Sequence, residues 1–412
     1  MRMFRRGLLC AFFLVFVPSW CAFQIDRTGL LFTLESASRE PATGQLLSLA
    51  EDWSVRLGGK EEFRAAGGDV IALRRAGMTV PPMPERRFLL LANGDALPFS
   101  RVKLADERFV VTPRIGAEKE ISVAPAQVAV IWLTAPDGER YPDKLRRSLA
   151  AGQRTRDRVL LRNGDSLEGT LAALDEKTVH LEIDKRKLEV RVDKIAAVAL
   201  NTELTSRRRP KGPCGRLVLA NGGRLSLTSA RCNEEALEGK TTFEAAVRVK
   251  LTDVIALSIC HGRATYLSDL KPKQIEQTPY LDAAFPPVFD GSVKGRDLRV
   301  GGSTFDKGLG MHAACRLTYE LAGRYDRFEA LVGLDDATGR DGSARVAVLV
   351  DGKPQKLGAS GELTHRNGPL AIRVDVAGAK QLTLVTDFGD RGDVQADVDW
   401  VDARLVKANA KR

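Results

Sequence analysis

The pentapeptide DVIAL occurs at Asp69–Leu73 and again, without change, at Asp253–Leu257. Between these two copies stand the looser versions QVAVIWL, at residues 127–133, and KIAAVAL, at residues 194–200. A short apolar run rich in β-branched residues and bounded by turn residues is typical of a buried strand. Its return at four places indicates that one supersecondary unit is repeated along the chain.

Three of the four copies are also preceded by similar openings, in which an Asn-Gly pair stands between apolar residues. The openings are LLLANGDAL (residues 89–97), VLLRNGDSL (159–167) and LVLANGGRL (217–225). Asn-Gly in this setting is a strong hairpin signal, because both residues tolerate a positive φ. The sequence therefore predicts four tandem β units, each of about five short strands, at residues 24–80, 85–140, 155–205 and 213–263.

Units of this size resemble small closed or half-open barrels of the SH3-like or Sm-like type. A single long β array is the alternative, since the first unit lacks the Asn-Gly opening. Signals for helices are few. The segment that begins at Tyr141, YPDKLRRSLAAGQRTR, is the best candidate for a short helix.

The first 22 residues have the composition of a secretory signal peptide. The basic segment MRMFRR precedes the apolar run GLLCAFFLVFV, and small residues follow near Cys21 and Ala22. The apolar run is short for a transmembrane span, although an uncleaved membrane anchor is the alternative. We therefore expect a protein that is secreted or held in the periplasm or cell envelope of a bacterium, with no membrane span after cleavage.

Cysteine usage and charge limit the classes of function. No CxxC pair occurs, so zinc-knuckle and thioredoxin-type sites are not indicated. A disulfide among Cys214, Cys232 and Cys260, or buried free thiols there, are both compatible with the sequence. The net charge is +10. Since the basic residues are not interleaved with aromatics, no nucleic-acid partner is expected, whereas an acidic polysaccharide or an anionic envelope surface stays open.

The last third of the chain has a different pattern. A polar, proline-rich lead-in at residues 264–284 precedes alternating segments such as ARVAVLV (344–350) and TLVTDF (383–388), which Gly and Asp turns divide. Alternation at short, regular spacing predicts an antiparallel β-sandwich over residues 285–407. The fold class is therefore all-β, with tandem small β-barrel-like repeats followed by a β-sandwich.

The same region carries a family resemblance. KGLGMHA at Lys307–Ala313 is followed by LTYELAGRYDRFEALVGLDD from Leu317 and by VDVAGAKQLTLVTDFGDRGDVQADVDWVDARL from Val374. In this order and spacing the segments resemble the NPCBM module, which is related to the family-51 carbohydrate-binding modules. The resemblance implies a galactose-binding-domain-like jelly roll of the kind appended to secreted proteins, often beside glycoside hydrolases. It also implies a galactose-type or related polysaccharide as ligand, and a structural Ca²⁺.

Candidate site residues lie in the matching segments. The predicted carbohydrate contacts are His312, Tyr325, Asp335, Asp399 and Trp400, and the predicted Ca²⁺ ligands are Asp397 and Asp399. Each prediction has a structural alternative. The histidine can be a framework residue fixed by hydrogen bonds, the aromatics can be core side chains, and aspartates close to glycine can be turn residues.

Nothing in the sequence indicates catalysis. No nucleophile and carboxylate can be assigned to His312, and no alternation of strands and helices indicates a (β/α)₈ hydrolase domain. The leading hypothesis is an exported, non-catalytic glycan-binding protein. The alternative is a structural or assembly protein of the envelope, in which both the repeats and the sandwich contact other proteins. A glycoside hydrolase with an unrecognised site is the third.

Overall fold

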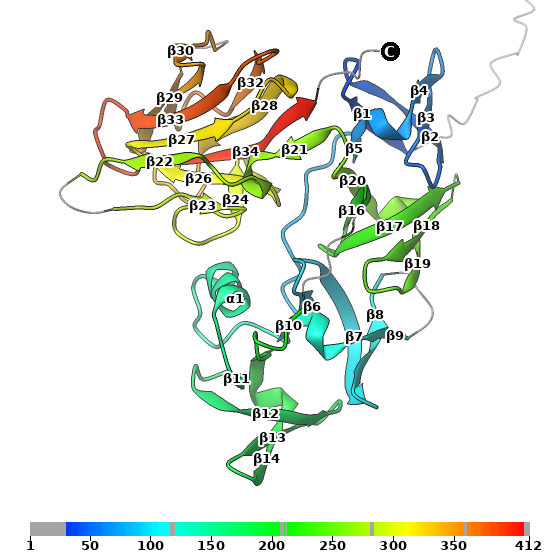
Figure 1. Cartoon of the computed structure of the whole chain (residues 1–412). Coiled ribbons are helices and arrows are strands. Elements are labelled where there is room, and N and C mark those ends of the chain that lie inside the picture. The colour runs from blue at the N-terminus through cyan, green and yellow to red at the C-terminus, as the bar shows by residue number, and fades with distance from the viewer. Residues whose placement is uncertain are drawn as a thin grey trace, which may run out of the picture.

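The computed structural model describes residues 30–115, 120–206, 210, 212–233, 235–280, 284–357 and 361–407. The predicted signal peptide, residues 1–22, lies outside the described residues. In the described part, the strands pair in antiparallel fashion and the one α-helix is α1 (Pro142–Ala151). The predicted all-β fold is confirmed, with the β repeats in one part of the molecule and a β-sandwich in another (Figure 1). None of the helices seen in these ranges has the length and apolarity that crossing a bilayer requires.

Twenty strands precede the sandwich in four groups of five, and a 3₁₀ turn comes before the last strand of each group. The first group is β1 (Leu31–Ser36), β2 (Ala42–Leu49), β3 (Val55–Gly58), β4 (Phe63–Ala65) and β5 (Val70–Arg75). The second is β6 (Phe88–Leu91), β7 (Ala96–Ala105), β8 (Arg108–Pro113), β9 (Ile121–Val123) and β10 (Val128–Trp132). The third is β11 (Asp157–Leu161), β12 (Ser166–Leu174), β13 (Thr178–Ile183), β14 (Arg186–Arg191) and β15 (Ile195–Ala199). The fourth is β16 (Cys214–Leu219), β17 (Arg224–Cys232), β18 (Ala236–Thr241), β19 (Ala246–Lys250) and β20 (Val254–Cys260).

The last strand of each group connects the groups. Within a group it pairs with the first strand, and between groups β5 pairs with β20 and β10 pairs with β15. Every residue of β10 and β15 is buried. A strand with both faces covered is apolar throughout instead of alternating. This explains why DVIAL, QVAVIWL and KIAAVAL are continuous apolar runs.

The Asn-Gly pairs form the predicted hairpins. They connect β6 to β7, β11 to β12 and β16 to β17, which are antiparallel neighbours. Gly94 and Gly164 have φ angles of +87° and +92°, which glycine adopts more readily than other residues. The side-chain oxygen of Asn93 accepts a hydrogen bond from the Asp95 backbone N–H at 3.0 Å, which closes the turn. The SH3-like or Sm-like type of each unit, and the unit boundaries, stay predictions.

The structure chooses between the two states that the sequence leaves open for the cysteines. Cys214 and Cys260 are register partners on β16 and β20. Both are nevertheless free thiols, as are Cys232 and Cys315. Of these four, only Cys260 is partly exposed, so it is the thiol that a reagent can reach.

The sandwich consists of two sheets and a small hairpin. One sheet has the order β23 (Val288–Phe289), β26 (Gly308–His312), β34 (Asp397–Lys407), β28 (Tyr325–Leu334), β32 (Leu370–Asp375), and β21 (Ala264–Tyr266) also pairs with β34. The other has the order β22 (Gln274–Gln277), β27 (Cys315–Glu320), β33 (Gln381–Phe388), β29 (Ser343–Val350), β30 (Lys353–Pro354), and β31 (Glu362–Thr364) pairs with β29. The hairpin is β24 (Leu298–Val300) with β25 (Ser303–Phe305). The lead-in expected at residues 264–284 thus supplies β21 and β22 to the sheets.

The sandwich has its own apolar core and contacts the repeats in several places, including ion pairs of Asp306 with Arg216 and Arg224 of the fourth group at 3.3 Å. Its core contains Phe328, Leu384 and Trp400. The first contact lies beside β34, where Val406 and Ala264 pack with Ala37, Ile71 and Ala72 of the first group. Ion pairs surround this apolar patch: Arg74 with Asp402 at 2.7 Å, Arg404 with Glu35 at 2.7 Å, and Arg263 with Asp69.

The second contact joins α1 to the loop before β24. Arg146 Nη2 donates to both carboxylate oxygens of Asp297, at 2.7 and 2.6 Å, and both side chains are buried. A buried pair of opposite charges is strongly destabilised when only one partner is removed. These contacts therefore hold the sandwich in one position against the repeats.

Candidate carbohydrate-binding site

His312 is the last residue of β26, next to β34. Gly308 and Gly310, which precede it, allow the close approach that the sequence suggests. Gly308 has a φ of +153°, and a Cβ atom at Gly310 would lie 2.5 Å from the backbone oxygen of Gly291. No side chain other than hydrogen fits at Gly310, so β26 runs directly beneath the 291–293 loop. This places His312 at one end of the sandwich.

Both ring nitrogens of His312 are engaged by carboxylates. Nδ1 lies 2.8 Å from Asp397 Oδ1, and Nε2 lies 2.8 Å from Asp393 Oδ1. Burial disfavours the charged ring, but the hydrogen bonds to Asp397 and Asp393 outweigh it and raise the pKa of His312. Although burial opposes ionisation of Asp397, its bonds to His312 and Lys294 lower its pKa. With no ring nitrogen left for a ligand, this geometry favours His312 as a framework residue that positions Asp393.

One exposed aromatic ring contacts this polar group, and a second exposed ring of the sandwich packs on the partly buried Phe388. We call Tyr280, Phe285 and Phe388 the aromatic rim. Phe285 is 39% exposed, and the centroid of its ring lies 4.5 Å from that of the His312 ring. Tyr280 is 49% exposed and meets Phe388 edge to face, at 5.7 Å between centroids. Exposed rings beside fixed polar groups are what a sugar site needs, because a sugar ring has both an apolar face and hydroxyl groups.

Two of the predicted sugar contacts are core residues, which corrects their assignment. Trp400 has no exposed surface, and its indole N–H donates to Thr386 Oγ1 at 3.0 Å inside the sandwich. Tyr325, the first residue of β28, is 4% exposed. Neither ring has a face that a sugar could stack on. The physical reason is that β34 and β28 are inner strands, whose alternate side chains enter the core.

Asp335 and Asp399 are also buried, at 2% and 1% exposure. Asp399 Oδ2 accepts from the Arg299 backbone N–H at 3.1 Å and Asp335 Oδ1 from that of Ala337 at 3.0 Å. The second oxygen of each has no hydrogen-bond partner among the described residues. Burial raises the pKa of both carboxyls, and their mutual repulsion adds to the effect at Asp399. Both carboxyls are therefore harder to ionise than a free aspartate, and neither is placed to contact a sugar.

The predicted Ca²⁺ ligands do not fit the ion. Asp397 has both oxygens occupied, one by His312 and the other by Lys294 Nζ at 2.7 Å. Asp399 offers one free oxygen, whereas Ca²⁺ takes six to eight oxygen ligands. Across the described ranges, no group of three or more His, Cys, Asp or Glu side chains is arranged to hold a metal. Asp397 instead belongs to the hydrogen-bond network of His312.

The sequence analysis missed Tyr280, Phe285 and Lys294 as candidate contacts. Tyr280 falls in the segment 264–284, which we expect from sequence to be a lead-in, and Phe285 follows it directly. The available signal was the pair of aromatics in TPYLDAAFPP, set in a proline-rich loop where core burial is less expected. Asp393 is not among the candidate residues from the sequence either.

Comparisons with known proteins agree with this fold. Residues 263–406 match the family model of the NPCBM/NEW2 domain. A stretch of 112 residues is 32% identical to the "Putative endo-alpha-N-acetylgalactosaminidase" of Renibacterium salmoninarum, and covers 27% of this chain and 7% of that protein. The chain thus spans a small part of that relative.

Solved structures of similar sandwiches come from Clostridium perfringens. One is the CBM51 of GH95 in complex with methyl-galactose. It is 27% identical, the match covers 35% of this chain and 99% of that chain, and the TM-score is 0.31. Another is CBM51-2 with GlcNAc and INT domains from ZmpB: 24% identity, 42% of this chain, 36% of that chain, TM-score 0.32.

The fold defines the class of the C-terminal part as a β-sandwich module. Specifically, residues 263–406 are an NPCBM/NEW2 domain, which confirms the resemblance found in the sequence. The match covers about a third of the chain and leaves out the β repeats, whose relation to SH3-like or Sm-like barrels it does not address.

Proposed function

We propose that this protein is an exported, non-catalytic glycan-binding protein, and that its NPCBM/NEW2 domain binds a galactose-type sugar at the aromatic rim. The observation that carries the proposal is the exposed ring of Phe285, packed on a histidine that two carboxylates fix. The complex of a similar sandwich with methyl-galactose supports the choice of sugar to test first.

The rim offers both kinds of contact that a sugar requires. The apolar face of a hexose would lie on Phe285 or Tyr280, while its hydroxyl groups would meet Asp393 and Lys294. Asp393 uses Oδ1 for His312, and its side chain is partly exposed, so a hydroxyl can reach the carboxylate. The Lys294 side chain is 48% exposed and held at 2.7 Å from Asp397. Few groups here need to change position on binding, which limits the entropic cost.

The test is a glycan array with the full mature chain, followed by calorimetric titration with methyl-galactoside. We expect Phe285→Ala and Asp393→Asn each to weaken binding about tenfold or more, the loss typical of a central contact. Tyr141→Ala is the matched control, because Tyr141 is also 39% exposed but lies at the start of α1. Lack of binding to any neutral or amino-sugar glycan, or equal losses in rim and control variants, would contradict the proposal.

A further inference from the structure

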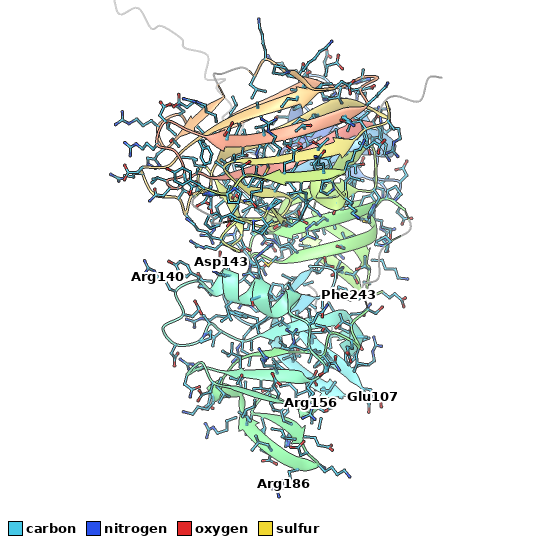
Figure 2. All side chains as sticks on the ribbon, turned by 60° about the vertical axis from the view of Figure 1, so that its left-hand side comes forward. Glu107, Arg140, Asp143, Arg156, Arg186 and Phe243 are labelled. Carbon is cyan, nitrogen blue, oxygen red and sulfur yellow. The ribbon has the colours of Figure 1, made fainter. Side chains whose placement is uncertain are left out.

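A groove of about 1480 Å³ runs between α1, the nearby strands of the repeats and the sandwich. Figure 1 shows α1 beneath the sandwich and beside β6, β10 and β11, and Figure 2 shows Asp143, at the start of α1, facing the sandwich above it. The sandwich lines the groove with Val288, Asp290, Gly295 and Asp297. Neither the aromatic rim nor the His312 network contributes to it.

The walls of the groove are held in position by ion pairs. Arg146 and Asp297 form the buried pair described above. Asp143 accepts from the backbone N–H of Asp297 at 3.2 Å and from Arg296 Nε at 3.3 Å. Since these bonds join α1 to the sandwich, the groove exists before any ligand enters. A preformed site loses less entropy on binding.

Positive charge dominates the lining. Six cationic and four anionic side chains line the groove. Three of the four acids are neutralised by close partners: Asp297 by Arg146, Glu168 by Arg158 at 2.6 Å, and Asp290 by Lys307 at 2.9 Å. The cations that remain are Lys144, Arg147, Arg154 and Arg156.

These remaining cations have weak partners or none among the described residues. Arg147 lies 3.9 Å from Asp297, which already binds Arg146. Arg156 lies 3.7 Å from Asp184, and both side chains are mostly exposed, so that pair contributes little. The groove therefore presents positive charge that the protein itself does not balance.

Arg154 lines the groove and is anchored there by one of its nitrogens. Its Nε donates to the Leu200 carbonyl at 3.2 Å, but its Nη2 is buried and has no hydrogen-bond partner in the ranges that the structure describes. Burial lowers the pKa of Arg154, and the charge of Arg158 adds to the effect.

We propose that this groove is a second binding site that takes an acidic polysaccharide, whose carboxylate or sulfate groups bind Arg147, Arg154, Arg156 and Lys144. Arginine suits such groups because its planar fork donates two parallel hydrogen bonds. A nucleic acid is a poorer fit, since no aromatic side chain lines the groove for base stacking.

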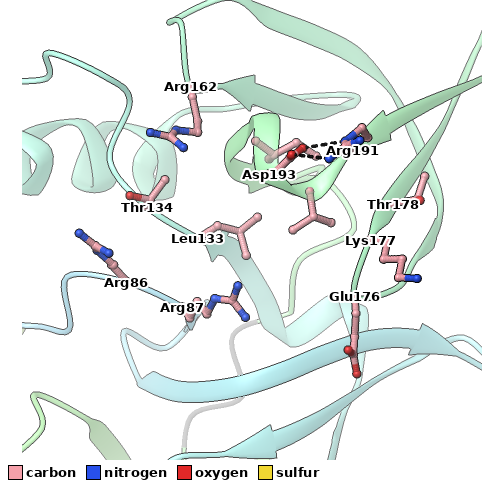
Figure 3. A pocket seen from close by; sticks show the side chains of 12 residues that line it. Arg86, Arg87, Leu133, Thr134, Arg162, Glu176, Lys177, Thr178, Arg191 and Asp193 are labelled. Atoms are coloured by element: carbon pink, nitrogen blue, oxygen red, sulfur yellow. Dashed lines mark hydrogen bonds and ion pairs between the residues drawn. The ribbon is translucent and has the colours of Figure 1, made fainter.

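A smaller hollow on the repeats provides the comparison (Figure 3). It measures about 690 Å³ and contains five cationic and two anionic side chains. Arg191 is paired with Asp193 at 2.7 Å, Arg162 with Asp137 at 2.7 Å, and Glu176 with Arg101. Its three other cations are Arg86, Arg87 and Lys177, and none of them lines the groove. Replacing all three removes the same charge as replacing three cations of the groove.

The experiment measures binding of the full mature chain to heparin, polygalacturonate and neutral dextran, at about 50 and about 300 mM NaCl. We expect binding to at least one acidic polymer, weaker at high salt, and none to dextran. The variant Arg147→Gln/Arg154→Gln/Arg156→Gln should lose about tenfold or more in affinity. The variant Arg86→Gln/Arg87→Gln/Lys177→Gln, with the same change of charge, should lose less than about twofold. If the groove variant fails to fold, the single change Arg156→Glu at an exposed position keeps the test valid.

The two binding sites can be tested separately, because each has its own ligand and its own variant. The groove variant should bind methyl-galactoside as the wild type does, whereas Phe285→Ala should keep its affinity for the acidic polymer. The inference is overturned if the two triple variants lose affinity equally, or if the chain binds neither heparin nor polygalacturonate. A preference for single-stranded DNA over both acidic polysaccharides would also overturn it.

Discussion

The β repeats and the sandwich are both antiparallel β-structure, yet they bury different kinds of side chain. In the described residues up to 262, six polar or charged residues are buried, whereas the shorter stretch from 263 to 407 has ten. In the repeats, several of the six lie at joints. Asp95 of the second group accepts from Ser226 of the fourth at 2.9 and 2.7 Å, and Arg146 meets the sandwich.

In the sandwich, four of the buried polar residues lie near one another at the His312 end: His312, Asp335, Asp397 and Asp399. Burying polar groups costs free energy unless they are paired, so such a concentration needs a reason. In the repeats the reason is the contact between units, and in the sandwich we propose that it is the support of the surface site at the aromatic rim. Four predictions test this contrast, from the largest expected effect to the smallest.

The first prediction concerns the joint between α1 and the sandwich. Arg146→Met should lower the free energy of unfolding by roughly 3–5 kcal/mol, because it leaves the buried Asp297 carboxylate with only the distant Arg147, at 3.9 Å. Urea unfolding of the full chain measures this. Arg158→Met is the control, since its pair with Glu168 is exposed and should contribute less than about 1 kcal/mol. Similar losses in both variants would show that the joint is not a special contact.

The second prediction concerns the close packing beside His312. Gly310→Ala should cost at least about 2 kcal/mol, because the new Cβ would lie 2.5 Å from a backbone oxygen that cannot rotate away. At Gly68, in the repeats, a Cβ meets nothing within 4 Å. Gly68→Ala should therefore change stability by less than about 0.5 kcal/mol. An unchanged melting temperature for Gly310→Ala would contradict the close approach of β26 to the 291–293 loop.

The third prediction concerns the charge of His312. Its folded-state pKa is raised, so the folded chain binds this proton more tightly than the unfolded chain does. The resulting stability is fully present below the unfolded pKa of 6.5 and is lost as pH rises through the folded pKa. We expect the melting temperature of the wild type to fall by a few degrees, about 2–4 °C per kcal/mol, from pH near 6 to pH near 8.5.

Calorimetry of His312→Gln checks this assignment. The groups that face the ring are Asp393, Asp397 and Phe285, and Lys294 acts through Asp397. The variant should lose most of the pH slope. What remains comes from other shifted groups, including Asp335 and Asp399, whose pKa values burial raises, and Cys260, whose lowered pKa acts in the opposite direction. A slope identical to that of the wild type would contradict the assignment to His312.

The fourth prediction concerns the reactivity of the thiols and not the stability of the fold. A hydrogen bond from the Cys214 thiol lowers the pKa of Cys260 to about 7, and Cys260 is partly exposed. Iodoacetamide should therefore label Cys260 in the native chain, at a rate that rises through about pH 7. Burial raises the pKa of Cys232 to about 12 and of Cys315 to about 11, so both should stay unlabelled. Peptide mass mapping gives the result, and labelling of Cys315 before Cys260 would contradict it.

The predictions made from sequence hold best where the deciding interactions are local. Asn93 and Gly94 form their hairpin because a side-chain hydrogen bond and a positive φ act within four residues. The alternation around Val346 and Leu384 indicated strands for the same reason. The site was less predictable. Trp400 and Asp399 match a family motif, but whether such residues face a ligand or the core depends on which strands flank them.

What the sequence alone determined is therefore the all-β character and the repeated unit, since turn chemistry and alternation act over a few residues. The NPCBM/NEW2 domain followed from the resemblance of its ordered segments to that family. The tertiary structure decided which groups pair: β5 with β20, and β10 with β15. It also brought Phe285 onto His312, and placed α1 against the sandwich to form a charged groove. These contacts join residues far apart in the chain, and burial at such contacts is a property of the packed molecule that no short stretch of residues encodes.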